Sequence, residues 1–225
     1  MLDDINLNIP AGSTVGIIGS TGSGKSTVAK LLLRFHDATR GAIRLDGVDL
    51  RELSQDEIRG RIAYVPQKAW LFSGTVASNL RFGNEDATEA DMLHALQVAQ
   101  STFVLEQPQG LDTPVAQGGT NFSGGQRQRL AIARALMKRA DLYIFDDSFS
   151  ALDFKTDAAL RHALQDETRD AAVLIIAQRI STILHADQIV VLKDGEVVGL
   201  GTHGELMETC EVYRAIAESQ MKGGE

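Results

Sequence analysis

The sequence predicts an α/β protein with a mostly parallel central sheet, an antiparallel edge and an inserted helical region. Short, fully apolar runs recur along the chain and alternate with helix-length segments, as in parallel sheets that helices cover on both faces. A mainly helical stretch from about residue 73 to about residue 140 interrupts this alternation. The runs predicted to form strands are 14–18, 42–45, 62–65, 142–145, 172–176 and 189–192.

Signals for helix ends and turns place the remaining elements. A glycine-rich loop follows the first strand, and a helix is predicted over 26–35. Thr88 begins the capping pattern TEAD before a helix to about residue 98, and Ser123 begins a longer helix to about residue 137. The segment KDGE at 193–196 predicts a tight hairpin turn between the last two strands, which supplies the antiparallel edge.

Composition limits the class of protein. The 225 residues are 44% hydrophobic and 23% charged, which suits one large globular domain or two small ones. A net charge of −8 argues against a nucleic-acid partner. No run approaches the roughly 18 apolar residues of a membrane span. The N-terminus lacks signal-peptide features and the single cysteine, Cys210, excludes a disulfide framework, so we expect a cytosolic compartment.

The loop GSTGSGKST at 19–27 has the chemistry of a polyphosphate site. Its glycines let backbone amides converge on phosphate oxygens. Lys25 supplies a positive charge for the β- and γ-phosphates, and the Ser26 hydroxyl suits magnesium. The following helix turns its positive end towards the anion. The residues predicted to contact the nucleotide are Gly19, Ser20, Thr21, Gly22, Ser23, Gly24, Lys25, Ser26 and Thr27.

A second motif, NFSGGQRQRL at 121–130, resembles the signature sequence of ATP-binding cassette (ABC) proteins. In this motif a serine and two glycines begin a helix, which creates another anion site. A helical insertion separates this helix end from the chain's own glycine loop, so it suits a nucleotide held by another molecule. The resemblance implies that two such domains pair head to tail, with each ATP between one glycine loop and the other signature. The signature residues implied to bind the partner's nucleotide are Ser123, Gly124, Gly125 and Gln126.

The resemblance covers nearly the whole chain. YVPQKAWLFSG at 64–74 is similar to the family's Q-loop and implies that Gln67 contacts magnesium. LYIFDD at 142–147 resembles the Walker B strand, with Asp146 as the magnesium-linked carboxylate. SALD resembles the D-loop, which places Asp153 at the cassette interface, and AQRIST at 177–182 resembles the switch loop. The implied magnesium ligands are Ser26, Gln67 and Asp146.

These motifs imply one ABC nucleotide-binding domain over residues 1–225 with a P-loop NTPase (RecA-like) core. The core is expected over about 1–72 and 141–205, a helical subdomain over about 73–140, and a C-terminal helix over about 205–225. The segments 41–50 and 194–206 also resemble family sequences, the latter of the exporter type. Implied partners are a second cassette and the transmembrane domains of an exporter. The implied location is the cytoplasmic face of the cell membrane.

Two positions depart from the family pattern. Asp147 stands where the family has a glutamate that polarises the attacking water, a shortening of one bond, about 1.5 Å. A misplacement near 1 Å can lower a rate about 100-fold. Gln178 stands where the switch loop carries a histidine, and its neutral amide donates a hydrogen bond without positive charge. With Lys25, these residues occupy the implied catalytic positions, so we expect slow hydrolysis.

The intact signature beside a weakened site predicts the degenerate-site half of a heterodimeric exporter of the multidrug or lipid type. ATP at this chain's loop would mainly hold the dimer together, and turnover would occur at the loop of a different chain with an intact catalytic glutamate. Three alternatives stay open. Each departure on its own is compatible with tolerated variation, the chain could be a regulatory ATP-binding module that never hydrolyses, or it could be the ATPase subunit of an importer.

Two further features concern adenine and the membrane partner. The first eighteen residues contain no aromatic side chain, although the family stacks one on adenine, so we expect weaker adenine binding and a chain that starts late. The run AWLF at 69–72 suits either core packing or a groove for a coupling helix of the membrane domain. The transported substrate is not predicted, because the residues that select it lie in the membrane domain.

Overall fold

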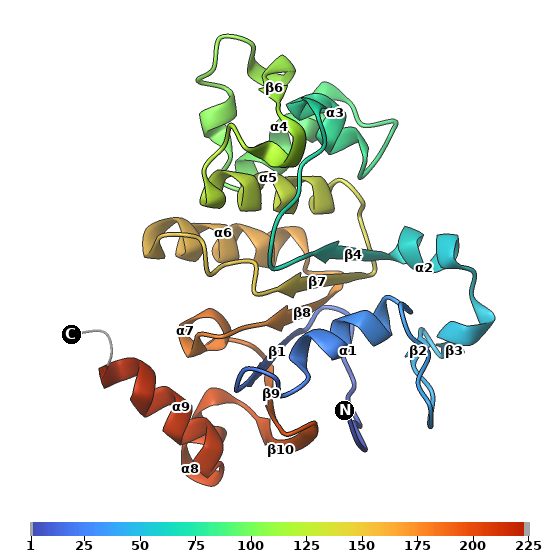
Figure 1. Cartoon of the computed structure of the whole chain (residues 1–225), viewed down its shortest axis with the longest axis vertical. Helices are drawn as coiled ribbons and strands as arrows, with labels where there is room; N and C mark the ends of the chain where they lie inside the picture. Colours follow the sequence, from blue (N-terminus) through green and yellow to red (C-terminus); the bar gives the residue numbers. More distant parts are fainter. Residues whose placement is uncertain (1, 223–225) are drawn as a thin grey trace.

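The computed structural model describes residues 2–222, and its centre is a six-stranded sheet of order β10-β9-β1-β8-β7-β4 (Figure 1). Five strands are parallel, and β10 pairs antiparallel with β9. The predicted parallel sheet with an antiparallel edge is confirmed. The strands are β1 (Thr14–Gly19), β4 (Ile62–Val65), β7 (Leu142–Asp146), β8 (Ala172–Ile176), β9 (Gln188–Lys193) and β10 (Glu196–Gly201).

Alternate residues along the buried strands enter two different cores, because successive strand side chains point to opposite faces. In β7, Ile144 belongs to the core on one face, whereas Tyr143 and Phe145 belong to the core on the other. Helices α1 and α2 cover the first face, and α5, α6, α7, α8 and α9 contribute to the second. These helices are α1 (Lys25–Leu32), α2 (Gln55–Arg61), α5 (Gly124–Leu136), α6 (Phe154–Glu167), α7 (Ile180–Ile183), α8 (His203–Thr209) and α9 (Glu211–Lys222).

The segment between β4 and β7 rises above the sheet in Figure 1 and consists mainly of helices. Its helices α4 and α5 begin with capping boxes at Thr88 and Ser123, as predicted. The division of the chain into core and helical subdomain at about residues 73 and 140 stays a prediction. The other elements of this segment are β5 (Gly74–Thr75), α3 (Val76–Arg81), α4 (Glu89–Val98), η2 (Thr102–Val104), η3 (Gly110–Asp112), β6 (Pro114–Val115) and η4 (Gln117–Gly119).

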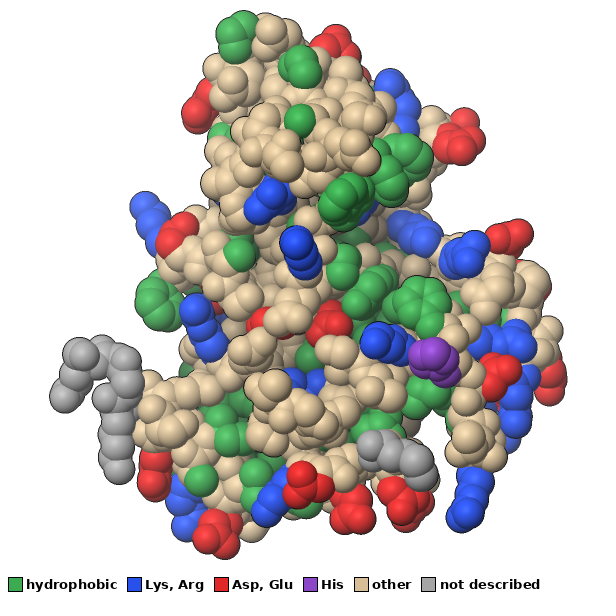
Figure 2. Space-filling model, in the orientation of Figure 1, with side chains coloured by type: hydrophobic (Ala, Val, Ile, Leu, Met, Phe, Trp, Pro, Cys, Tyr) green, Lys and Arg blue, Asp and Glu red, His purple; other side chains and the backbone are tan. Residues whose placement is uncertain are grey.

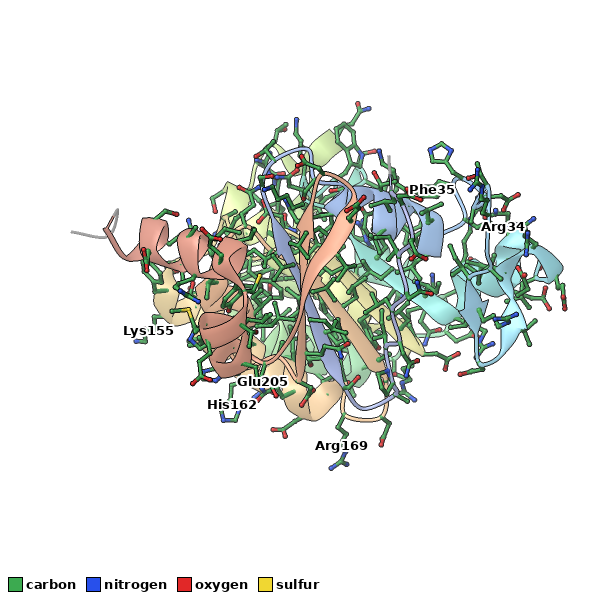
Figure 3. The ribbon with its side chains drawn as sticks, turned by 90° about the horizontal axis from the view of Figure 1, so that it is seen from below. Arg34, Phe35, Lys155, His162, Arg169 and Glu205 are labelled. Atoms are coloured by element: carbon green, nitrogen blue, oxygen red, sulfur yellow. The ribbon has the colours of Figure 1, made fainter. Side chains whose placement is uncertain are left out.

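Seen from below, the strands run through the middle of the molecule, with the C-terminal helices on one side and the hairpin of β2 (Arg44–Leu45) and β3 (Val48–Asp49) on the other (Figure 3). Arg34 and Phe35, labelled there, lie near the hairpin. The Arg34 guanidinium donates to the backbone oxygens of Leu50, 2.9 Å away, and Leu53, 2.8 Å away, which ties the end of α1 to η1 (Leu50–Glu52).

Two predicted elements are corrected by the structure. The run 42–45 lies outside the main sheet: Asp46 (φ 49°) and Gly47 (φ 81°) form a tight turn, so β2 pairs with β3 instead. The predicted single C-terminal helix is two helices, since Cys210 adopts an extended conformation between α8 and α9. The ends of the predicted domain, at residues 1 and 223–225, lie outside the described residues.

The hairpin turn after β9 is confirmed, with Asp194 at φ 51° and Gly195 at φ 93° between paired Lys193 and Glu196. Positive φ at both central residues gives the turn the twist that two-residue hairpins require. Within residues 2–222, no helix combines the length and the hydropathy needed to cross a bilayer.

Candidate functional site

A cavity of about 460 Å³ lies beside the ends of β1, β7 and β8, where the carboxyl ends of parallel strands meet. It brings together the glycine loop, the Q-loop, the end of the Walker B strand and the switch loop, four segments far apart in sequence. Its lining residues are Gly19, Ser20, Thr21, Gly22, Gly24, Lys25, Ser26, Thr27, Gln67, Asp146, Asp147, Ile176, Gln178, Ile216 and Gln220.

The glycine loop requires its glycines for two different reasons. A side chain at Gly19 would place its Cβ 2.1 Å from the backbone oxygen of Leu192, so β9 leaves no room for one. Gly24 has φ 105° and begins α1, a conformation that side chains rarely adopt. No side chain caps α1, so the amides at its start are open to an anion in the cavity. The predicted loop residue Ser23 is buried beneath the loop, outside the cavity lining.

Lys25 spans the loop from the first residue of α1. Its Nζ donates to the backbone oxygens of Gly19, 2.7 Å away, and Ser20, 2.9 Å away. Burial lowers the pKa of Lys25, while the nearby carboxylates of Asp147 and Asp146 act in the opposite direction. The ammonium group therefore lies in the cavity beside the carboxylates, where a polyphosphate would offer it further oxygens.

Asp146 ends β7 and is buried, and it accepts from two hydroxyl groups. Ser26 Oγ lies 3.2 Å from Asp146 Oδ1, and Tyr64 OH lies 3.2 Å from Oδ2. Burial, reinforced by the Asp146 charge, raises the pKa of Tyr64 to about 12, so the phenol stays protonated and donates. The predicted ligands Ser26 and Asp146 are thus adjacent.

The donor set suits magnesium only together with phosphate. Among residues 2–222, no cluster of three His, Cys, Asp or Glu side chains could hold a metal ion. The hydroxyl, amide and carboxylate oxygens of Ser26, Gln67 and Asp146 are hard ligands, and all three residues line the cavity. Mg²⁺ commonly binds through one or two such groups plus substrate phosphates and water. The residues present therefore fit a magnesium ion that a nucleotide brings with it.

Asp147 and Gln178, the two positions predicted to depart from the family pattern, contact each other directly. Gln178 Nε2 donates to Asp147 Oδ2 at 2.6 Å, and Gln67 Nε2 donates to the same oxygen at 2.9 Å. Burial raises the pKa of Asp147, while the Gln67 hydrogen bond partly opposes this shift. Two neutral amides thus donate to one oxygen of the carboxylate, and φ 49° at Asp147 turns the chain away from β7.

The predicted signature residues lie outside the cavity lining. Ser123 Oγ accepts from the Gln126 backbone amide at 3.2 Å, and Gln126 Oε1 accepts from the Ser123 amide at 2.9 Å. A Cβ on Gly125 would lie 3.1 Å from the backbone oxygen of Ala151, so the signature packs against the predicted D-loop. Asp153, the last residue of that loop, caps α6. The structure therefore does not bring the signature to this chain's own glycine loop.

The cavity also contains residues that the sequence did not identify. Ile216 and Gln220 of α9 form part of its lining, and Tyr64 contacts Asp146. The α9 residues carry no local motif, and only the packing of a C-terminal helix beside the switch loop brings them here. Tyr64 belongs to a predicted strand, in which successive side chains point to opposite faces of the sheet. That alternation is the signal in the sequence that indicates which face Tyr64 occupies.

The run 69–72 divides between the two predicted roles. Ala69 and Leu71 are buried in the core, whereas Trp70 is 49% exposed and Phe72 is 44% exposed. The Phe72 ring lies 4.5 Å from the ring of Phe82, which is 63% exposed. Arg134 donates to the Trp70 backbone oxygen at 3.0 Å, beneath these rings. Core packing is thus wrong for Trp70 and Phe72, and Figure 2 shows hydrophobic side chains gathered below the helical part of the molecule.

Comparisons with known proteins agree with these motifs. The sequence model of the ABC transporter family matches residues 2–150. An uncharacterized ABC transporter ATP-binding protein of Mycobacterium tuberculosis is 49% identical over 223 residues, 98% of this chain and 38% of the relative. An ATP-dependent lipid A-core flippase of Photobacterium profundum is 42% identical over 221 residues, 97% of this chain and 38% of the relative.

A solved structure described as a bacterial Atm1-family ABC exporter with ATP bound is similar to this chain with a TM-score of 0.93 and 35% identity. The match covers 97% of this chain and 38% of the exporter chain. The predicted P-loop NTPase fold is therefore confirmed. The chain spans 38% of the length of the two relatives and of the exporter chain.

Proposed function

The chain belongs to the ABC transporter family as one of its ATP-hydrolysing domains, and from this premise we propose that it is the degenerate-site motor domain of an exporter. It binds ATP with Mg²⁺ at its own glycine loop and hydrolyses it slowly. The observation that carries the proposal is the contact between Asp147 and Gln178 in a cavity that also holds Lys25, Ser26 and Asp146.

Gripping and cleaving a phosphate make different demands on this cavity. Gripping needs the loop amides, the Lys25 ammonium and an oxygen-ligated Mg²⁺, and the residues for all three are present. Cleaving needs a base placed near the attacking water, and a positioned general base contributes about 100- to 10,000-fold. Asp147 is shorter than glutamate, and its Oδ2 already accepts from Gln67 and Gln178. The base therefore lies further from a terminal phosphate than a glutamate would.

The second cassette would complete each site. The start of α5, with Ser123 to Gln126, lies outside this chain's cavity, as a surface intended for a partner's nucleotide would. We therefore expect head-to-tail pairing with a different chain that supplies a catalytic glutamate. In that pair, ATP at this chain's loop holds the two domains together while the partner's loop turns over ATP against this chain's signature.

The exposed aromatic cluster of Trp70, Phe72 and Phe82 supports a membrane-domain partner. Exposed aromatic groups of this kind favour protein contacts. The half-buried Arg134 side chain holds the Trp70 backbone beneath them, so the cluster is fixed before a partner arrives. We propose that a helix of the transmembrane domain docks here, which places the chain at the cytoplasmic face of the membrane.

Single-turnover ATP hydrolysis tests the degenerate-site proposal. The wild type and the variant Asp147→Glu with Gln178→His are each measured with an excess of enzyme over ATP. Restoring the longer carboxylate and the charged donor should raise the rate about 100-fold, the loss that a misplacement near 1 Å produces. The affinity for ATP should stay within about threefold, because Lys25 and the loop amides are unchanged and a histidine in place of Gln178 still donates a hydrogen bond.

Thr156→Val is a matched control, because the Thr156 hydroxyl lies outside the cavity and donates only to Oδ2 of Asp153, the residue that caps α6. It should leave the single-turnover rate unchanged. A wild-type chain that hydrolyses ATP without a partner as fast as the repaired variant would contradict the degenerate site. Slow hydrolysis by both, unchanged when the partner cassette is added, would favour a regulatory module that never hydrolyses.

A further inference from the structure

Gln220 of α9 bonds to the backbone on both sides of Arg179 in the switch loop. Its Nε2 donates to the Gln178 backbone oxygen at 2.7 Å, and its Oε1 accepts from the Ile180 amide at 2.9 Å. One side-chain amide therefore uses both its donor and its acceptor on the loop that carries Gln178. Gln220 and Ile216 also line the cavity, so α9 reaches both the loop and the site.

The switch loop lacks a cap of its own, which explains what the Gln220 amide supplies. Helix α7 has only four residues, and its N-cap residue, Arg179, makes no side-chain cap hydrogen bond. The first amides of a helix have no partner within the helix, and a side chain usually satisfies one of them. Here the cap comes from Gln220, forty positions along the chain from Ile180.

Helix α9 is anchored well enough to act as a fixed support. Tyr213 and Ala217 are buried in the core beneath it, and Tyr213 OH lies 2.8 Å from His203 Nδ1 of α8. The Gln178 side chain points from the loop to Asp147, while its backbone oxygen points to Gln220. The direction of the Gln178 amide is thus set from two sides, by the carboxylate and by α9.

Resting on the ATP site proposed above, we propose that Gln220 is a positioning residue for recognition of the terminal phosphate. It holds the backbone of Gln178 so that the Gln178 side-chain amide faces the Asp147 end of the cavity. In the ATP site proposed above, the third phosphate of ATP would lie there, and ADP lacks that phosphate. Loss of the Gln220 bonds should therefore weaken ATP binding and leave ADP binding nearly unchanged.

The test measures the dissociation constants of Mg-ATP and Mg-ADP for the full chain by isothermal titration. Gln220→Met keeps the length of the side chain and removes both hydrogen bonds. We expect the preference for ATP over ADP to fall about 5- to 10-fold, the effect of one or two neutral hydrogen bonds. Gln220→Glu can still accept from Ile180 but cannot donate to Gln178, and we expect at least half of that loss on a logarithmic scale.

A double-mutant cycle separates positioning from direct contact and from general stability. Gln178→Ala should lower the preference for ATP by a similar factor, and the double variant with Gln220→Met should lower it no further, because Gln220 acts through Gln178. Amide hydrogen exchange at Ile180 should become about 10-fold faster in Gln220→Met, as expected when a cap is lost. Glu218→Gln, an exposed change on the same helix, is the matched control and should change none of these values.

The proposal is overturned if Gln220→Met leaves the ATP-to-ADP preference within about twofold of the wild type, or if the two substitutions multiply in the cycle. Equal losses for ATP and ADP would also overturn it, because they would indicate a merely structural role. Failure of the ATP site itself gives a different result: the wild-type chain would then bind neither nucleotide.

Discussion

The two walls of the cavity differ in the chemistry of their side chains. The wall formed by the glycine loop and α1 carries a lysine ammonium, a hydroxyl and helix amides without a side-chain cap. The opposite wall, at the end of β7 and the switch loop, carries a buried carboxylate between two neutral amides. Under the proposed function, the nucleotide is held mainly from the first wall and cleaved from the second, so that hydrolysis can weaken while binding is retained.

Removing the Lys25 charge is the strongest test of the wall formed by the glycine loop and α1. Lys25→Met keeps the length of the side chain but removes its donors, so we expect ATP affinity to fall about 100-fold, within the range for hydrogen bonds to charged groups. Fluorescence titration with a labelled ATP analogue measures the loss. Lys30→Met, an exposed change at the other end of α1, is the control and should leave affinity unchanged. A loss below about fivefold would mean that the loop amides alone hold the phosphates.

The starts of α1 and α5 extend the comparison to the partner's site. Ser123→Ala removes half of the capping box of α5, and we expect the free energy of unfolding to fall by about 1 kcal/mol in urea denaturation. ATP binding to the isolated chain should not change, because Ser123 lies outside the cavity.

Thr88→Ala is matched to this change, since Thr88 caps α4 in the same way. Both variants should lose similar stability, but in the assembled pair only Ser123→Ala should slow turnover at the partner's loop. Equal slowing by both would show that the effect comes from stability, and not from the signature.

Local signals predicted most of the fold. The strands β4 and β8 and the caps at Thr88 and Ser123 follow from short apolar runs and from capping residues, which act within a few positions. The prediction that the run 42–45 joins the main sheet is wrong, because an apolar run does not reveal its pairing partner. Its turn at Asp46 and Gly47 decides the pairing, and it gives the run a short hairpin instead.

The candidate site was predictable where motifs carry it and hidden where tertiary packing carries it. The glycine loop, Gln67, Asp146 and the departures at Asp147 and Gln178 stand in recognisable segments, and the structure places them in one cavity. That Asp147 and Gln178 bond to each other could not be predicted, because the distance depends on the register of β7 and β8. Gln220 could not be predicted either, since it reaches the switch loop only through the docking of α9.

The smallest expected effect concerns the charge of Asp147, on the wall at the end of β7. Asp147→Asn keeps the shape of the side chain and removes a buried charge, so at pH 7 it should stabilise the fold by an amount on the order of 0.5 kcal/mol. The pKa of Asp147 is raised in the folded chain above its usual 3.8, mainly by burial. The unfolded chain keeps the usual value, so charging this group opposes folding.

The wild type should therefore gain stability relative to Asp147→Asn as the pH falls through the raised pKa of Asp147 towards 3.8, where the gain ends. Urea denaturation of both proteins between pH 7 and pH 4 measures the difference. A difference that stays constant with pH would mean that the groups opposing the shift, the Gln67 hydrogen bond first and the Arg179 charge among them, compensate the burial of the charge fully. The contrast between the wall that carries Lys25 and the wall that carries Asp147 would then rest on the geometry of their side chains alone.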